Sequence, residues 1–530
     1  TNDSAHIISS KGELEGGEVD VPFELPANET ETTFRPSFTF ARLWLYTGPG
    51  WLMSIAYLDP GNLESDLQAG AVGGYQLIWV LWWATVLGWA LQTLAARLGV
   101  VTGKHLAQVC RYEYGRFGSL FLWLMTQLAI IGSDIQEVVG SAIAWNVLFG
   151  WDLWIGCLIT AADAFLFLLL NSMGLRVLEA FFCALIGIMA ICFIIEFAIG
   201  KPDGVQIIKG WALPLCDESA VEQAVGMVGA VIMPHNLFLH SALVQTRKIK
   251  RTSIAAVRDG NYYNTIESGV TLFVSFIINL CIVAVFAKGF YGTDGADNIG
   301  LKEAGDKLEE EFGKAAKYLW AIGLLAAGQS STMTGTFAGQ YAMSGFLDLQ
   351  LKPYQQTLMT RAISLIPALT VALISSNSFD DVDEWLNVQQ SVQLPFALLP
   401  LLFMNCNTRV MGIFALSFKW RIFFYTASAG VIAVNVYLIY DTIIGLNSDN
   451  GLKTTLIVIS LVFYLGACIW LVWDFYSRKY DANKYGYDPS TSSMNVKSLL
   501  NDDNNGGFNE ATNERDNTAT MNDSNKVDIN

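Results

Sequence analysis

Long apolar runs separated by short polar breaks fill the chain between residues 42 and 476. A helix needs about 20 mostly apolar residues to cross a bilayer. The runs therefore predict an all-α polytopic membrane domain with about twelve transmembrane helices, several of them long enough to tilt or to break. The predicted spans are residues 44–72, 75–99, 117–147, 151–172, 176–199, 220–246, 262–289, 315–347, 357–376, 384–405, 418–444 and 453–476.

The two ends of the chain differ in composition from this apolar centre. Residues 1–41 carry eight acidic and two basic side chains, and residues 477–530 are rich in asparagine. Such polar segments cannot bury enough apolar surface to fold. We expect an acidic disordered tail at 1–41, a transmembrane domain at 42–476 and an Asn-rich disordered tail at 477–530.

Loop charges predict the orientation of the domain. Lys and Arg gather in cytosolic loops, and the loops at 73–75, 148–150 and 377–384 contain neither. Both termini are therefore expected in the cytosol. The same side receives the basic residues Lys104, Arg111, Arg116, Arg176, Arg247, Lys248, Lys250, Arg251, Arg258, Lys352, Arg409, Lys419 and Arg421.

Composition fits a membrane protein and argues against several other classes. Apolar residues make up 52% of the chain and charged residues 15%, whereas about 25% of residues are charged in ordinary soluble proteins. Eight cysteines in 530 residues, without a Cys-x-x-Cys pair, do not form the framework of a small disulfide-rich protein. The net charge of -16 argues against a nucleic-acid partner.

The first and sixth spans share a short motif. Asp59-Pro-Gly-Asn62 lies in the first span and Met233-Pro-His-Asn236 in the sixth, both of the form Xaa-Pro-Xaa-Asn. Because the two motifs are five spans apart, an odd number, the two copies face opposite ways across the membrane, which predicts inverted repeats at about 44–199 and 220–405. Two interrupted spans in corresponding positions indicate a transporter site near the bilayer midplane.

The residues at these two breaks suit a metal ion. Proline and glycine should unwind each helix and expose backbone carbonyl oxygens. Asp59 at bilayer depth costs roughly 2.5–3.5 kcal/mol, which a bound cation would offset. Because the thioether of Met233 is a soft ligand, the set favours Mn²⁺, Fe²⁺ or Cd²⁺ over Ca²⁺ and Mg²⁺. The alternative is a proline kink with capping Asp and Asn and a packing Met.

Two further groups suit proton transfer. His235 and His240 are five residues apart, unlike the i, i+4 histidines of a zinc helix, and imidazole titrates near neutral pH. Asp134 and Glu137 share one helix face, where like charges in an apolar environment resist joint ionisation. Arg361 is a candidate counter-charge on the cytosolic side. The alternatives are structural histidines and a static acid–Arg pair that fixes helix packing.

Three further groups of polar residues in the predicted spans give weaker signals. The small polar run 329–336 favours helix packing, although it could line a cavity. Asp163 is an intramembrane acid for which the sequence offers no partner. The tenth span carries neutral amides that could complete an ion's shell in one conformation: Asn387, Gln389, Gln390 and Gln393.

Together these motifs resemble the Nramp (natural-resistance-associated macrophage protein) family, over residues 40–475. The likeness rests on stretches 59–103, 133–140, 226–244, 328–335 and 393–397. It implies a LeuT-like fold with a 5+5 inverted repeat and two extra C-terminal helices at 418–476. It also implies a non-enzymatic, proton-coupled symporter of Mn²⁺ and Fe²⁺, and of Co²⁺ and Cd²⁺, without a resident cofactor or obligate protein partner.

The resemblance also assigns roles to individual residues. It implies metal ligation by the side chains of Asp59, Asn62, Met233 and Asn387 and by the carbonyls of Ala56 and Ala230. It implies a proton pathway through His235, His240, Asp134, Glu137 and Arg361. Relatives that carry Mg²⁺ or Al³⁺ lack the Met of the sixth span, so its presence favours a transition metal. The plasma membrane and an acidic endolysosomal or phagosomal-type vacuole membrane fit equally well.

Two other readings are weaker. A Na⁺-coupled amino-acid transporter would use the same breaks, but Asp59 would repel the substrate's carboxylate and Met233 would have no role. A membrane-embedded hydrolase or reductase would need a nucleophile–base pair at a recognisable spacing, and the sequence shows none. Substrate turnover without net transport would favour that enzyme.

Overall fold

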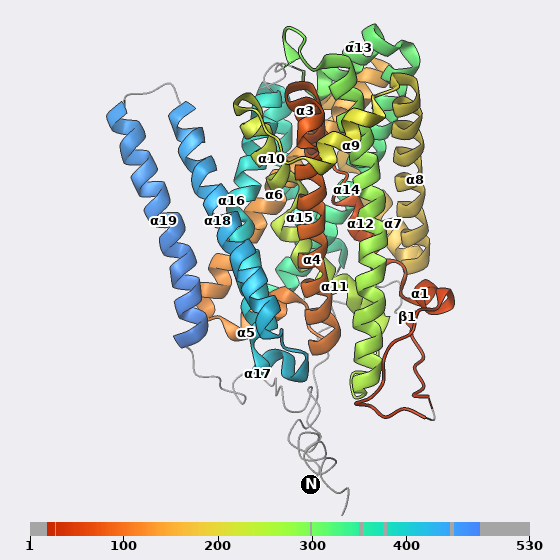
Figure 1. Ribbon diagram of the computed structural model, residues 1–530, viewed down its shortest axis with the longest axis vertical. Helices are drawn as coiled ribbons and strands as arrows, with labels where there is room; N and C mark the ends of the chain where they lie inside the picture. Colours follow the sequence, from red (N-terminus) through yellow and green to blue (C-terminus); the bar gives the residue numbers. More distant parts are fainter. Residues whose placement is uncertain are drawn as a thin grey trace, which may run out of the picture.

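The computed structural model describes residues 19–477, except 27, 297–298, 349–352, 375–378 and 446–449. The described residues form a helical bundle (Figure 1). Its first half contains β1 (Val19–Asp20), α1 (Phe40–Tyr46), α2 (Pro49–Ile55), α3 (Pro60–Gly73), η1 (Gly74–Leu77), α4 (Ile78–Thr102), α5 (Leu106–Glu113), α6 (Arg116–Phe149), α7 (Leu153–Met173), α8 (Leu175–Gly200) and α9 (Gly204–Ala212). The rest contains η2 (Glu218–Ala220), α10 (Val221–Val231), α11 (Pro234–Leu243), η3 (Val244–Thr246), β2 (Arg247–Lys248), α12 (Ile254–Phe290), α13 (Leu301–Phe312), α14 (Lys314–Leu347), α15 (Pro353–Ile374), α16 (Phe379–Cys406), α17 (Thr408–Met411), η5 (Gly412–Phe414), α18 (Phe418–Gly445) and α19 (Asn450–Ser477).

Each predicted span coincides with helix. The first is split into α2 and α3, and the sixth into α10 and α11, at the two predicted breaks. Among the described residues, seven helical segments are long and apolar enough to cross a membrane, or up to eight if the bent pair at 385–406 and 408–414 is one span. That twelve helices cross the membrane therefore stays a prediction.

The broken helices lie inside the bundle. α3 packs against α12 and α10, and α14 packs against α6 and α8. α18 and α19 lie at one side, where they contact α16 (Figure 1). Gly140 of α6 allows this close packing, because a Cβ atom there would overlap the ring of Pro60 at the start of α3. The glycine thus brings α6 against the first break.

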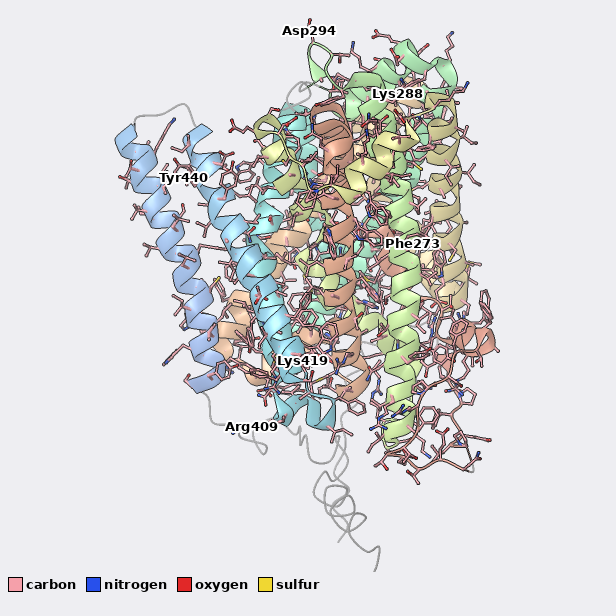
Figure 2. All side chains as sticks on the ribbon, in the orientation of Figure 1. Phe273, Lys288, Asp294, Arg409, Lys419 and Tyr440 are labelled. Atoms are coloured by element: carbon pink, nitrogen blue, oxygen red, sulfur yellow. The ribbon has the colours of Figure 1, made fainter. Side chains whose placement is uncertain are left out.

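The outer surface has the character expected of a membrane protein. Figure 2 shows Lys288 and Asp294 at one end of the bundle and Arg409 and Lys419 at the other. Between these ends, the side chains of Phe273 and Tyr440 lie on the outside, about half exposed. Charges at both ends and an apolar flank match a helical bundle in lipid.

The amino-terminal region differs from its prediction. Residues 1–41 were expected to be a disordered tail, but those from 19 onward that the structure describes dock on the bundle. β1 pairs in parallel with β2, and the side chains of Val21 and Phe34 are buried. These apolar residues anchor a segment whose acidic composition suggests a solvated tail. Residues 1–18 and the predicted tail beyond Ser477 lie outside the described residues.

Candidate metal site and proton pathway

Both helix breaks follow from the same backbone chemistry. Proline has no N–H, so the carbonyl four residues earlier loses its helical hydrogen-bond donor. Pro60 removes the donor for Ala56, and Pro234 removes the donor for Ala230. Both alanines are buried. The two carbonyls that the family resemblance implies as ligands are therefore those that the prolines release from the helices.

Hydrogen bonds hold the first break against its neighbours. The side-chain amide of Asn236, in the first turn of α11, donates to the carbonyl oxygen of Ala56 at 3.4 Å. The amide of Asn279 on α12 donates to the carbonyl oxygen of Tyr57 at 2.9 Å. The structure thus brings the two breaks together. Asn236 was not among the predicted site residues, although its position in the second motif mirrors that of Asn62 in the first.

Asp59 and Asn62 form one buried unit at the start of α3. Oδ1 of Asp59 accepts hydrogen bonds from the backbone N–H and from the side-chain amide of Asn62, both at 2.8 Å. Each residue is 1% exposed. Oδ1 of Asn62 is buried and has no hydrogen-bond partner among the described residues. A buried oxygen without a donor calls for an explanation, and a bound cation would supply one.

The second break contributes a thioether and an imidazole. Met233 has extended backbone, precedes α11 and makes no capping hydrogen bond through its side chain. It is 2% exposed. The next residue but one, His235, is buried, and its Nδ1 atom has no partner in the described part of the chain. Both side chains are therefore desolvated beside the break.

His240 lies in a different polar network. Its Nδ1 atom is 2.6 Å from the amide oxygen of Gln92 on α4, and its Nε2 atom is 3.4 Å from the hydroxyl of Ser268 on α12. The Gln92 amide also donates to the hydroxyl of Tyr57 in the first break at 3.3 Å. His240 is therefore linked to the break through hydrogen bonds. Sequence reasoning missed Gln92 and Tyr57, because a single Gln or Tyr in an apolar run carries no distinctive pattern.

Asp134 and Glu137 both face α14. A Cβ atom added at Gly335 of α14 would lie 2.6 Å from Asp134 Oδ1 and 3.1 Å from Glu137 Oε2. Ser133 donates to Glu137 Oε1 at 2.9 Å. Glu137 also interacts electrostatically with Asp134 and with Asp59. The acids of α6 thus form an electrostatic cluster with the acid at the first break.

Arg361 of α15 reaches the same cluster. Its Nη1 atom lies 3.5 Å from Asp134 Oδ1, and its Nη2 atom donates to the carbonyl oxygen of Thr332. The predicted pairing of this arginine with an α6 acid is therefore present. Two acids and one arginine are thus gathered in a single buried cluster.

The amides of α16 form a network with α6. Gln136 donates to Asn387 Oδ1 at 2.9 Å and accepts from Gln390 at 2.6 Å, while Gln389 donates to Gln393 at 2.7 Å. A Cβ atom at Gly61 would lie 2.9 Å from the Gln136 amide, so this network reaches the first break. Asn387 Oδ1 accepts one hydrogen bond here, which leaves one of its two lone pairs for a further ligand.

The remaining polar residues of the spans lie on α7 and α14. Asp163, for which the sequence offered no partner, lies near Gln329 of α14, and the atoms Asp163 Oδ2 and Gln329 Nε2 are both buried without a hydrogen-bond partner in the described part of the chain. The hydroxyls of Ser330, Ser331 and Thr336 donate to carbonyls of their own helix. This arrangement fits helix packing for the polar run of α14.

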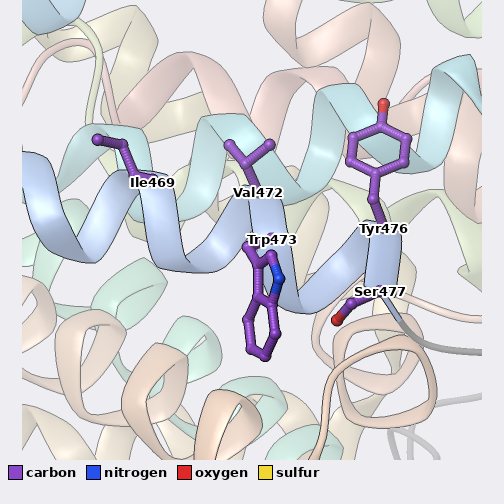
Figure 3. Close-up of a pocket in the computed structure, with 5 residues that line it drawn as sticks. All are labelled: Ile469, Val472, Trp473, Tyr476 and Ser477. Carbon is purple, nitrogen blue, oxygen red and sulfur yellow. The ribbon is translucent and has the colours of Figure 1, made fainter.

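The structure offers no competing metal centre within its described ranges. No group of three or more His, Cys, Asp or Glu side chains there could hold a metal ion. A shallow pocket on α19, mainly apolar, is lined by Ile469, Val472, Trp473, Tyr476 and Ser477 (Figure 3). Because α19 packs on α16 and α18, this pocket is separate from the broken helices. The two breaks remain the candidate site.

Comparisons with known proteins agree with this geometry. Residues 50–441 match a family model described as natural resistance-associated macrophage protein-like. The chain is 56% identical over 406 residues to the metal transporter nramp1 homolog of Dictyostelium discoideum, covering 76% of this chain and 75% of that protein. It is similar to the crystal structure of a manganese transporter of Eremococcus coleocola, at 29% identity and a TM-score of 0.76, over 85% of this chain and 99% of that chain.

A more distant likeness concerns the fold alone. The structure matches Mhp1, a nucleobase-cation-symport-1 family transporter, at 14% identity and a TM-score of 0.51, over 84% of this chain and 96% of that chain. With the similarity to the manganese transporter, this match confirms the predicted all-α, LeuT-like fold.

Proposed function

The chain belongs to the natural resistance-associated macrophage protein-like (Nramp) family, and from this premise we propose that it is a proton-coupled symporter of Mn²⁺ and Fe²⁺. Like the other members of this family, the protein is a membrane metal-ion transporter and not an enzyme. The proposal adds proton coupling, transport into the cytosol by alternating access, and Co²⁺ and Cd²⁺ as further substrates. The observation that carries it is the meeting of two proline breaks beside a buried Asp–Asn pair.

The metal substrate would bind where water is excluded. It would exchange most of its water for the Asp59 carboxylate, the free amide oxygen of Asn62 and the carbonyls of Ala56 and Ala230. Binding at Ala56 would compete with the long hydrogen bond from Asn236. We assign Asn387 to a different conformation, since its oxygen accepts from Gln136 here.

Selection among divalent ions would come from Met233. Hard cations such as Ca²⁺ and Mg²⁺ prefer shells made only of oxygen, whereas a thioether suits softer ions. A buried sulfur at the second break would therefore penalise a Ca²⁺ ion that must give up a water ligand. Mn²⁺ and Fe²⁺ accept mixed shells and would be favoured.

Protons would use the acids of α6. Metal binding neutralises Asp59 and so weakens its repulsion of Glu137, which favours proton release from the cluster toward Asp134 and Arg361. His235 lies beside the metal, and His240 connects through Gln92 to Tyr57; we assign both to proton handling. This arrangement couples metal and proton through electrostatics.

The driving force would come from the membrane. Each 100 mV supplies about 2.3 kcal/mol per elementary charge, so a divalent ion with a proton can move against its gradient. With both termini in the cytosol, the proposal places uptake at the plasma membrane or at an acidic endolysosomal or phagosomal-type vacuole. Either membrane offers protons on the non-cytosolic side.

The test is uptake of Mn²⁺ into proteoliposomes that contain a pH dye. We expect uptake with internal acidification, accelerated by an acidic exterior and unaffected by excess Ca²⁺. Fe²⁺, Co²⁺ and Cd²⁺ should compete with Mn²⁺. Uptake without acidification would contradict the proton coupling, and uptake of an amino acid driven by Na⁺ would contradict the metal substrate.

A further inference from the structure

A docked segment, here called the strap, covers the start of α12. It comprises residues 19–39, of which Ala27 lies outside the described residues. The strap runs beside the lower end of α12 and leads into α1 (Figure 1). It pairs with β2, where the Val21 N–H donates to the Lys248 carbonyl at 3.3 Å. At its other end, the Tyr263 hydroxyl donates to the Ser37 carbonyl at 2.6 Å.

Glu31 joins the strap to the first turn of α12. The hydroxyl of Ser253 and the backbone N–H of Ala255 both donate to Glu31 Oε2, at 2.8 and 2.9 Å. Ser253 is the N-cap of α12, and its hydroxyl also accepts from the N–H of Ala256 at 3.1 Å. A carboxylate beside the positive end of a 37-residue helix is stabilised there. The Glu31 carboxylate thus occupies the place at the N-terminus of α12 where an anion is stabilised. Ser253 beneath it is 4% exposed.

The basic residues before Ser253 make its hydroxyl a candidate substrate for a protein kinase. Lys250 and Arg251 stand three and two positions before it. Protein kinases select substrates by such charge patterns, and basic residues at these positions are typical of substrates of basophilic kinases. Ser253 itself has extended backbone, at φ −111° and ψ 121°, whereas Arg251 and Thr252 form a turn in which Arg251 donates to the Val100 carbonyl at 3.2 Å. A kinase would therefore have to displace this arginine as well as the strap. The inference rests on the cytosolic orientation of this loop in the proposed function, because kinases and ATP are cytosolic.

We propose that Ser253 is a phosphorylation site of a basophilic protein kinase and that Glu31 of the strap guards it. The kinase transfers the γ-phosphoryl group of ATP to the Ser253 oxygen; the hydroxyl proton is released, and ADP leaves. Because Glu31 covers the hydroxyl, only the undocked strap exposes the substrate. The phosphate adds about two negative charges, takes over the amides of the helix N-terminus and repels Glu31. Phosphorylation therefore keeps the strap undocked.

Release of the strap would reach the first broken helix. The strap continues into α1, where Arg42 pairs with Asp259 of α12 at 2.6 Å and the Tyr46 hydroxyl donates to the same carboxylate at 3.1 Å. α2, which follows α1, ends at the break that holds Asp59. A modification at Ser253 would thus act, outside the metal site, on the segment that leads into α1.

The first test measures phosphate incorporation. The full chain in nanodiscs is incubated with labelled ATP and the catalytic subunit of cyclic-AMP-dependent protein kinase, a basophilic enzyme. We expect label on Ser253, about tenfold faster in Glu31→Ala, which corresponds to about 1.4 kcal/mol of lost docking. Ser253→Ala should lose the label, and Thr252→Ala, a change at the exposed neighbour, should keep it. Label on Thr252 alone, no label on any variant, or equal rates with and without Glu31 would overturn the proposal.

The second test follows the strap itself by hydrogen exchange. Amides of residues 19–26 and 28–39 should exchange faster after phosphorylation and in Ser253→Asp, but not in Thr252→Asp. Unchanged exchange in the phosphorylated chain would overturn the proposal. Mn²⁺ uptake is measured on the same samples: absence of uptake by wild type contradicts the transport proposal, while labelling and exchange still decide the role of Ser253.

Discussion

The side-chain amide of Asn236 donates a hydrogen bond to the backbone carbonyl of Ala56, at 3.4 Å. The two residues are 180 positions apart, and each belongs to one of the two proline breaks. Pro60 deprives the Ala56 carbonyl of its helical donor, and Asn236 of the other repeat takes the place of that donor. A long, weak bond of this kind is easily exchanged for a metal ligand, which suits the proposed metal site.

Replacing Met233 with alanine should change ion selectivity more than transport. The thioether is the only soft donor in the proposed ligand set, so its loss removes the penalty on hard ions. We expect Ca²⁺ to become an effective competitor of Mn²⁺ uptake, while Mn²⁺ uptake falls by a smaller factor. Competition in proteoliposomes measures both. A mutant in which Mn²⁺ transport falls and Ca²⁺ still fails to compete would assign Met233 to packing.

Replacing Glu137 with glutamine should impair proton movement while leaving metal binding in place. The amide keeps the shape and the bond with Ser133 but cannot release a proton. We expect Mn²⁺ binding to persist and internal acidification to slow. Glu196→Gln is the matched control, because Glu196 on α8 is equally buried and outside the proposed pathway. An unchanged proton flux in Glu137→Gln would make Glu137 structural.

Adding a methyl group at Gly335 should disturb the acid cluster without touching the metal ligands. The new Cβ atom would lie 2.6 Å from Asp134 Oδ1, so a carboxylate or the helix must move. Overpacking of this kind costs about 1–3 kcal/mol. We expect Gly335→Ala to slow proton-coupled uptake strongly. Gly187→Ala is the control, since a Cβ atom there meets no described atom within 4 Å; equal activity of the two variants would contradict the assigned contact.

Much of the site follows from local chemistry and was therefore predictable. The breaks follow from Pro60 and Pro234, because proline lacks an N–H whatever surrounds it. The shared face of Asp134 and Glu137 follows from helix geometry alone. The Asp134–Arg361 pair was predictable because a buried acid in a membrane is usually paired with an opposite charge.

Partners that depend on tertiary packing were not predictable. The ligand role of Asn387 stays a prediction, but the hydrogen bond that its oxygen accepts from Gln136, 251 residues away, could not be predicted from the sequence. Residues 19–39 were predicted to belong to a disordered tail because of the acidic composition of residues 1–41, whereas their docking rests on contacts with residues far along the chain, such as that of Glu31 with Ser253.

The carboxyl-terminal end of α14 should show a pH-dependent contribution to stability. Asp348 accepts a hydrogen bond from Arg111 at 2.5 Å, and this bond lowers the pKa of the Asp348 carboxyl below its ordinary value of 3.8. A pKa lowered by folding gives stability that is present above the unfolded pKa and lost as pH falls through the folded one. The side chain is half exposed, so the pair is worth roughly 0.2–1 kcal/mol.

The comparison is wild type with Asp348→Asn, since asparagine also tolerates the left-handed backbone at this position (φ 55°). Thermal unfolding in detergent should favour wild type slightly at neutral pH. The difference should vanish as pH falls below the lowered pKa. A difference that is independent of pH would show that the ion pair does not contribute.

The most direct test concerns the buried carboxylate at the first break. Mn²⁺ binding to the purified protein is measured by calorimetry for wild type, Asp59→Ala and the control Glu196→Gln. We expect wild type and the control to bind alike and Asp59→Ala to lose binding altogether. Micromolar Mn²⁺ binding retained by Asp59→Ala would contradict a metal site at the two helix breaks.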